Sequence, residues 1–131
     1  MRVIPAAALL LCALMLAAPA RAETASVEGL WSPDQLSDYR VSLCGPQKDR
    51  LCFTVAALRK AADSARNRPY LGKTIIDGAK PDGANRWEGR LDLFGQSADS
   101  TITFRAPDTI ELKACMLLVV CQSIVMKRIG D

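Results

Sequence analysis

Four of the five cysteines in this 131-residue chain are the residues whose type and spacing most directly predict chemistry. Seven residues separate Cys44 from Cys52, and five separate Cys115 from Cys121. A zinc site made of four thiolates normally needs two C-x2-4-C pairs, which are closer than either pair here. In an oxidising compartment, an even number of cysteines is typical of disulfides. The sequence therefore predicts two disulfide bonds and no metal site.

The residue types that most enzymes need are missing or isolated. The chain has no histidine, which excludes His-dependent triads and histidine acid–base catalysis. No G-x-S-x-G or S-x-x-K motif gives a serine a partner base, and no glycine-rich phosphate loop occurs. Glu88 and Asp92 share one side of a predicted strand, but exposed charges that alternate with apolar residues are ordinary on an outer face. We predict a protein that is not an enzyme and holds no cofactor.

The first 22 residues have the three-part pattern of a secretory signal peptide. Arg2 precedes an apolar run over residues 6–18, and Ala20-Arg21-Ala22 matches an A-x-A cleavage signal. The run is too short to span a membrane comfortably, because a span needs about 20 apolar residues. We predict cleavage after Ala22 and one exported domain over residues 23–131. That domain would not span a membrane, and it would lie in the periplasm of a Gram-negative bacterium or be secreted.

Removal of the leader leaves a nearly neutral chain. It takes away two arginines and no acid, so 15 basic and 14 acidic residues remain, with a net charge of +1. Nucleic-acid binding normally requires a basic patch or stripe. The densest basic stretch, residues 59–68, is interrupted by Ala, Asp and Ser. We therefore predict no nucleic-acid partner.

Alternating apolar and polar residues predict about eight short strands. They cover residues 28–31, 39–44, 51–57, 73–77, 87–93, 101–105, 110–114 and 123–128. Residues 45–49, 78–85, 94–97 and 106–108 are rich in turn formers, and residues 59–67 allow one or two helical turns or a loop. This spacing is typical of an antiparallel sandwich or up-and-down barrel with at most one short helix.

One face of these strands supplies an apolar interior. Its predicted members are Trp31, Tyr39, Val41, Leu43, Phe53, Val55, Trp87, Leu91, Ile102, Phe104, Ile110, Leu112, Ile124 and Met126. An eight-stranded barrel is just wide enough to be filled by side chains or to hold one small ligand. In a domain this small we expect a largely filled interior with a pocket at one mouth.

Four segments resemble the domain-of-unknown-function 2147 family, which consists of small exported bacterial proteins with a lipocalin-like β-barrel. They are Gly29-Leu30-Trp31; the Leu43-Cys44-Gly45 and Leu51-Cys52 hairpin; Arg68-Pro69-Tyr70-Leu71-Gly72 with Trp87-Glu88-Gly89; and the region from Leu112 through Cys121-Gln122-Ser123 to Arg128. Together they span nearly the whole domain. The resemblance implies a lipocalin-like antiparallel barrel and an exported location, and it gives no mechanism.

In such barrels a tryptophan of the first strand packs under an arginine of the last strand, which here implies Trp31 and Arg128. A guanidinium over an indole gives a cation–π contact. Arg128 is in phase with Met126 and therefore is predicted to face inward. It would act either as a structural plug or as an anchor for a ligand carboxylate, to which its planar fork is suited.

The segment from Lys113 to Gln122, KACMLLVVCQ, places five apolar residues between two cysteines. A straight strand would hold the two cysteines about 20 Å apart, so a bond between them requires the run to fold back. We prefer Cys44–Cys52 and Cys115–Cys121 over two cross-bonds between the hairpins, because the first hairpin is self-sufficient. The apolar run then becomes a loop at one barrel end that either plugs the barrel or presents a sticky patch.

These observations favour two functions. The first is binding of a small apolar or lipid-like ligand, with Trp31, Arg128, Met126, Leu117 and Leu118 as candidate ligand-binding residues. The alternative is a protein-interaction module, such as an inhibitor or an envelope-assembly partner, that takes no small ligand and uses residues 116–120.

Overall fold

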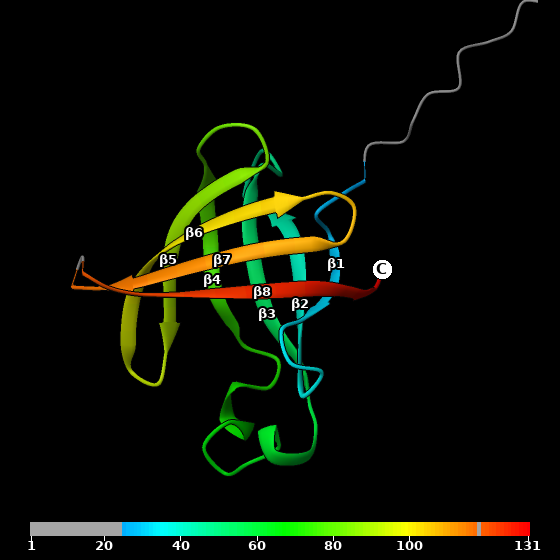
Figure 1. Cartoon of the computed structure of the whole chain (residues 1–131), viewed down its shortest axis with the longest axis vertical. Helices are drawn as coiled ribbons and strands as arrows, with labels where there is room; N and C mark the ends of the chain where they lie inside the picture. Colours follow the sequence, from blue (N-terminus) through cyan, green and yellow to red (C-terminus); the bar gives the residue numbers. More distant parts are fainter. Residues whose placement is uncertain (1–24, 118) are drawn as a thin grey trace, which may run out of the picture.

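The computed structural model describes residues 25–117 and 119–131, which form a closed barrel of eight antiparallel strands (Figure 1). The strands are β1 Gly29–Ser32, β2 Ser37–Cys44, β3 Arg50–Leu58, β4 Thr74–Pro81, β5 Arg86–Leu93, β6 Gln96–Arg105, β7 Thr109–Met116 and β8 Val120–Gly130. They follow one another around the barrel in chain order, and β1 closes it by pairing with β8. The predicted all-β antiparallel barrel is confirmed. The predicted leader, residues 1–22, lies outside the described residues.

Strand β4 is longer than the sequence pattern indicated. We expected a strand over residues 73–77 and a long turn over residues 78–85, but β4 continues to Pro81. The pairing of β4 with β5 shifts register between residues 76 and 80, and Gly78 has a φ of 78°. A bulge inserts residues without ending a strand, and glycine adopts a positive φ at little cost. Gly78 and Pro81 therefore belong to the strand, and the turn is confined to residues 82–85.

Residues 59–73, between β3 and β4, contain two 3-10 helices of three residues each, η1 Lys60–Ala62 and η2 Arg68–Tyr70. In Figure 1 this segment is green and lies at the lower end of the molecule. The described part of the chain contains no α-helix, so these two turns take the place of the single short helix that we allowed for. We call residues 59–73 the roof segment.

The barrel interior is filled by the apolar face of the strands, as expected. The buried core consists of Val27, Trp31, Val41, Leu51, Phe53, Val55, Ile75, Ile76, Ala79, Ile102, Phe104, Ile110, Leu112 and Met126. The other predicted inner residues, among them Tyr39, Trp87 and Leu91, are partly buried against this core. Leu51 and the three β4 residues were not in the predicted set.

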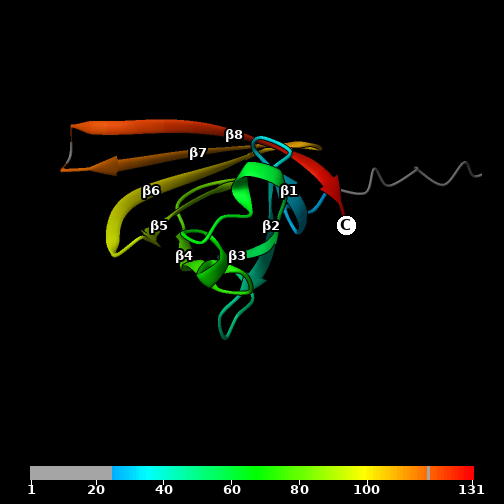
Figure 2. The same ribbon diagram turned by 90° about the horizontal axis from the view of Figure 1, so that it is seen from below.

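The two ends of the barrel differ. Because successive strands run in opposite directions, residues 33–36, the roof segment, residues 94–95 and residues 117–119 connect strands at one end, which we call the mouth. The other end, the base, holds residues 45–49, 82–85 and 106–108 and both termini of the described barrel. In Figure 2 the β7–β8 hairpin runs well past the rest of the barrel on the mouth side.

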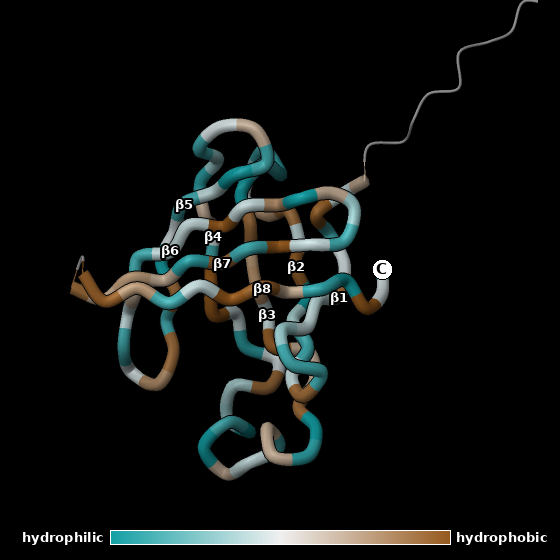
Figure 3. The backbone as a smooth tube through the Cα atoms, in the orientation of Figure 1, coloured by the Kyte–Doolittle hydropathy of each residue, from teal (hydrophilic) through white to brown (hydrophobic). Residues whose placement is uncertain are grey.

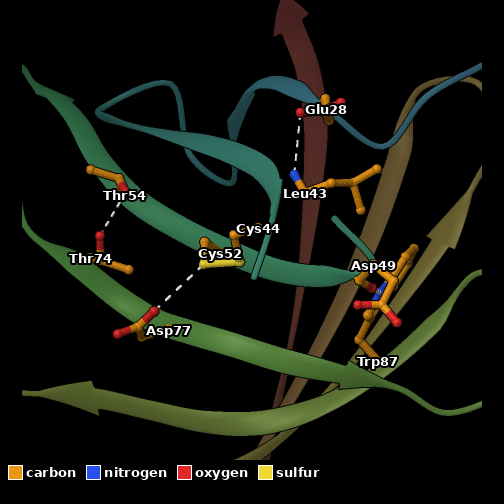
Figure 4. Close-up of a disulfide and its surroundings, with 9 residues drawn as sticks. All are labelled: Glu28, Leu43, Cys44, Asp49, Cys52, Thr54, Thr74, Asp77 and Trp87. Atoms are coloured by element: carbon orange, nitrogen blue, oxygen red, sulfur yellow. Dashed lines mark hydrogen bonds between the residues drawn. A yellow bond between two sulfur atoms is a disulfide. The ribbon is translucent and has the colours of Figure 1, made fainter. Parts of the chain in front are cut away.

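Both predicted disulfides are present on the outer face of the barrel. Cys44 and Cys52 are joined across the β2–β3 hairpin with Cα atoms 6.1 Å apart (Figure 4). The Cys52 sulfur lies 3.7 Å from a carboxylate oxygen of Asp77 on β4. Cys115 and Cys121 face each other directly across β7 and β8, with Cα atoms 4.0 Å apart. The residues between them therefore form a folded-back loop, as predicted, and not a core strand.

Candidate functional site

At the base, Arg128 lies over Trp31. The guanidinium carbon is 4.5 Å from the centre of the indole, which is fully buried and whose Nε1–H donates to the Val27 carbonyl at 3.0 Å. The guanidinium also donates to three backbone carbonyls: those of Pro107 at 3.0 Å, Glu28 at 2.7 Å and Ser26. These carbonyls belong to the β6–β7 turn and to the segment that leads into β1, so one side chain holds three parts of the base together.

The close approach of Arg128 requires a glycine at position 29. A Cβ atom added there would lie 2.6 Å from Arg128 Nη1, and the φ of Gly29 is 149°. Gly29 therefore does two things: it allows a backbone conformation that other residues rarely adopt, and it leaves room for the guanidinium. With its donors directed at carbonyls of the chain itself, Arg128 is built into the base as a plug.

The candidate ligand-binding residues do not converge on one site. Trp31 and Met126 are buried in the core, and Trp31 pairs with Arg128 across the seam between β1 and β8. Leu117 is at the tip of the β7–β8 hairpin, about 30 Å along β8 from Arg128 at a rise of about 3.3 Å per residue. Leu118 lies outside the described residues. Any ligand site that uses the hairpin tip is therefore separate from the Trp31–Arg128 pair.

The mouth contains a pocket of about 230 Å³ under the roof segment. Its apolar walls come from the inner faces of β2, β3 and β5 and from the roof, and its rim is polar. The lining residues are Asp34, Ser37, Tyr39, Val55, Leu58, Ala62, Asn67, Tyr70, Leu93 and Phe94. We call this the roofed pocket.

The roof segment is tied to the barrel at both of its ends. At one end Arg59 forms a two-pronged ion pair with Asp38, with both contacts at 2.6 Å, and also donates to the Gln35 carbonyl. At the other end Tyr70 packs edge-on against Phe94, with ring centres 5.1 Å apart, and its hydroxyl accepts the Phe94 N–H at 2.8 Å. Backbone hydrogen bonds add to these contacts: Arg59 N–H donates to the Leu36 carbonyl, and Val55 exchanges hydrogen bonds with Gly72 and Lys73.

Phe94 occupies an unusual position. It forms the β5–β6 turn with Gly95, and both residues have positive φ, 54° and 70°. A large aromatic residue rarely adopts this conformation, because the left-handed region crowds its Cβ. Tyr70 on one side and the Arg66 guanidinium, 3.9 Å from the ring centre, hold the ring across the mouth. The sequence marked residues 94–97 only as a turn, so it gave no sign that this ring lines a pocket.

Asp34 places a negative charge on the rim of the roofed pocket. Partial burial by itself raises the pKa of this carboxyl group. The hydrogen bonds from the backbone N–H groups of Ser37 and Leu36 and from the Ser37 hydroxyl favour the charged form and bring the pKa below its ordinary value. The β1–β2 loop is thus closed around an ionised carboxylate.

A second and more apolar pocket, of about 320 Å³, adjoins the first. It lies where the inner faces of β5 to β8 continue past the closed part of the barrel, and we call it the hairpin groove. Its lining residues are Leu91, Leu93, Phe94, Gln96, Ser97, Ala98, Ala114, Met116, Val120 and Gln122. Leu93 and Phe94 line both pockets, so the roofed pocket and the hairpin groove meet at the Phe94 ring.

The tip of the β7–β8 hairpin carries exposed apolar side chains. Leu117 is 87% exposed and Val119 is 82% exposed, and Met116 and Val120 beside them are also exposed. Figure 3 shows this tip as a brown, hydrophobic end at the left of the molecule. Single exposed apolar residues are common on protein surfaces, but contiguous groups such as these four are not.

No family model, curated protein or solved structure matches this chain. Within the described ranges, histidine, cysteine, aspartate and glutamate side chains form no group of three or more that could hold a metal ion. Over the same residues there is no helix that is both long enough and apolar enough to cross a membrane. The case for a function therefore depends on the mouth, the base and the hairpin themselves.

The plug at the base predicts a strong and specific requirement for arginine. Replacing Arg128 with lysine keeps the charge but removes the planar guanidinium, whose N–H groups reach three carbonyls. We therefore expect the free energy of unfolding to fall by about 2–4 kcal/mol. Urea unfolding followed by tryptophan fluorescence measures this loss, and the near-UV spectrum reports the Trp31 surroundings. Equal stability of the Arg128→Lys variant and the parent would show that the charge alone is sufficient.

The Asp34 carboxylate predicts a pH-dependent contribution to stability. Because its folded-state pKa is lowered, the group stabilises the fold above its unfolded-state pKa of about 3.9, and this contribution is lost as the pH falls through the folded-state value. The Asp34→Asn variant should therefore be less stable than the parent at neutral pH, and the gap should close as the pH falls through the lowered folded-state pKa. Thermal unfolding over a pH series tests this, and a gap that does not change with pH would contradict it.

Proposed function

We propose that this protein is an exported β-barrel that binds a small apolar or lipid-like ligand at its mouth. One observation carries the proposal: the apolar inner face continues beyond the filled core into two adjoining pockets that share Leu93 and Phe94. The base, in contrast, is closed by Arg128 over Trp31. A ligand would therefore enter and leave at the mouth.

The dimensions of the mouth favour a slender ligand. The roofed pocket and the hairpin groove, at about 230 and 320 Å³, are each at or below the low end of the usual range for ligand pockets. A ligand that occupied both would pass the Phe94 ring and place apolar surface against Leu91 and Leu93. Its polar end would meet the rim, where Arg66 carries a positive charge and Asp34 a negative one.

Export and an oxidising compartment complete the proposal. The leader pattern at residues 1–22 motivates export, and the two disulfides are compatible with the periplasm or an extracellular location. The resemblance to the domain-of-unknown-function 2147 family supports the same assignment. We propose binding and not catalysis, because the chain has no histidine and the Asp34, Ser37 and Tyr70 side chains at the mouth make hydrogen bonds that hold the fold.

The exposed hairpin tip favours a second candidate function, a protein-interaction module such as an inhibitor or an envelope-assembly partner. Leu117 and Val119 project into solvent ahead of a disulfide that stiffens the hairpin behind them. These two aliphatic side chains would fit an apolar pocket on another protein, and their burial there would supply most of the binding energy.

The ligand proposal predicts probe uptake that depends on the inner face of β5. Protein exported from its own leader and purified from the periplasm should carry lipid, and after delipidation it should bind parinaric acid or N-phenylnaphthylamine at micromolar concentration. Leu91→Gln and Leu93→Gln together should weaken probe binding at least tenfold, because they place amides in both pockets.

The matched control also replaces two aliphatic residues with glutamine, but on the outer face of the barrel. Val125→Gln and Ile129→Gln change exposed apolar residues of β8 that line neither pocket, and they should leave probe binding unchanged. A delipidated parent protein that takes up neither probe, or equal losses in both variants, would refute the ligand proposal.

The second candidate predicts capture of one defined partner protein by crosslinking in the periplasm. The double change Leu117→Gln and Val119→Gln should abolish that capture, because it removes the apolar surface of the tip without touching the barrel. Mass spectrometry of the crosslinked species identifies the partner. The Leu71→Gln variant, which changes another exposed apolar residue on the roof segment, serves as the control. An unchanged crosslink pattern in the tip variant would rule out this function.

A further inference from the structure

Strand β8 has an open edge along most of its length. It pairs with β7 from Val120 to Lys127, but β1 is only four residues long and reaches β8 at Lys127, Arg128 and Gly130. Among the described residues, no strand lies on the outer side of residues 120–126. This edge is long and regular, because the β7–β8 register has no bulge.

The register identifies which backbone groups on this edge are unpaired. The Cα atoms of Cys115 and Cys121 are 4.0 Å apart, which is the spacing of a non-hydrogen-bonded pair and not the ~5.5 Å of a hydrogen-bonded one. Pairs alternate along an antiparallel ladder, so Cys121, Ser123 and Val125 all direct their N–H and C=O groups away from β7. Three residues therefore present six backbone hydrogen-bonding groups at the open edge.

The edge also lacks the features that usually prevent strand pairing. Natural edge strands carry lysine, proline, bulges or inward charges. Residues 114–126 contain no charged residue and no proline, and Val120 and Val125 are exposed. An edge of this composition is expected to acquire a neighbouring strand.

We propose that the occupant of this edge is β8 of a second copy of the chain, in an antiparallel pair related by a twofold axis at Ser123. In this register Ser123 faces Ser123 of the other copy, and Cys121 faces Val125 in both directions. All six free backbone groups on each chain then pair, whereas a shift by two residues leaves some of them unpaired. The open stretch of seven residues is matched by seven on the second copy.

Charge and the available alternatives favour this occupant. The nearest charged residue on the strand, Lys127, lies opposite Val119 of the other copy, so no like charges meet. Insertion of the hairpin into a lipid bilayer would cover the apolar tip but would leave the open edge without hydrogen-bond partners in hydrocarbon, which is costly. A second strand gives hydrogen-bond partners to the free backbone groups and also packs against the exposed apolar side chains of the edge. The proposal of this assembly does not rest on ligand binding at the mouth.

Sedimentation of the periplasmic protein over a micromolar concentration series tests the proposal, and the parent should show a reversible monomer–dimer equilibrium. Ser123→Pro removes an N–H that the barrel does not use, and Ser123→Lys places two positive charges across the twofold axis. Each should raise the dimer dissociation constant at least tenfold. The matched control, Thr101→Lys on the outer face of β6, should dimerise like the parent.

A crosslink tests the register directly. Mild oxidation of the Ser123→Cys variant should give a covalent dimer, because paired residues at a twofold axis fall within disulfide reach. Thr101→Cys should give none. A parent that remains monomeric at all concentrations, a Ser123→Cys variant that does not crosslink, or an edge occupied by a different protein would each overturn the proposal. The thermal midpoint of each variant confirms that its barrel is folded, and the crosslinking arm does not depend on the proline variant folding.

Discussion

The contact of Arg128 with Trp31 closes the barrel, and the arrangement of the rest of the molecule depends on it. Strand β1 is too short to cover β8, so closure relies on a few residues at the base and on one guanidinium that joins β8, the β6–β7 turn and the segment before β1. Because the seam is made only there, the edge of β8 over residues 120–126 has no neighbouring strand among the described residues. The open mouth, the projecting hairpin and the free strand edge all follow from this short seam.

The molecule is consequently polarised along the barrel. At the base, large side chains such as Trp31 and Phe104 meet edge to face and fill the interior. Toward the mouth the same inner face carries smaller residues, including Ala98 and Ala114, and the space is bounded by Tyr70 and Phe94, which come from outside the strands. Filled and open regions are thus two ends of one continuous apolar surface.

The sequence was informative where structure follows a simple period. Alternation located most strands and most of the core, and cysteine spacing predicted both disulfides. It was less informative at β4, where the bulge near Gly78 interrupts the period and hides the contributions of Ile76 and Ala79. A pocket at one mouth was predicted, but its lining residues Tyr70 and Phe94 were not, because a 3-10 turn and a positive-φ turn place them. Leu117 was recognised as a tip residue, but its separation from Trp31 and Arg128 depends on strand lengths that the pattern underestimated.

The placement of the two disulfides also bears on how the chain is oxidised. Each bond joins cysteines that are consecutive in the domain, with sequence separations of 8 and 6 residues. Short separations make the native partner the nearest thiol in the unfolded chain, since loop-closure entropy favours the shorter loop. Pairing these four cysteines in chain order therefore gives the native set directly. Oxidation in chain order thus reaches the native disulfides without a step that exchanges one pairing for another.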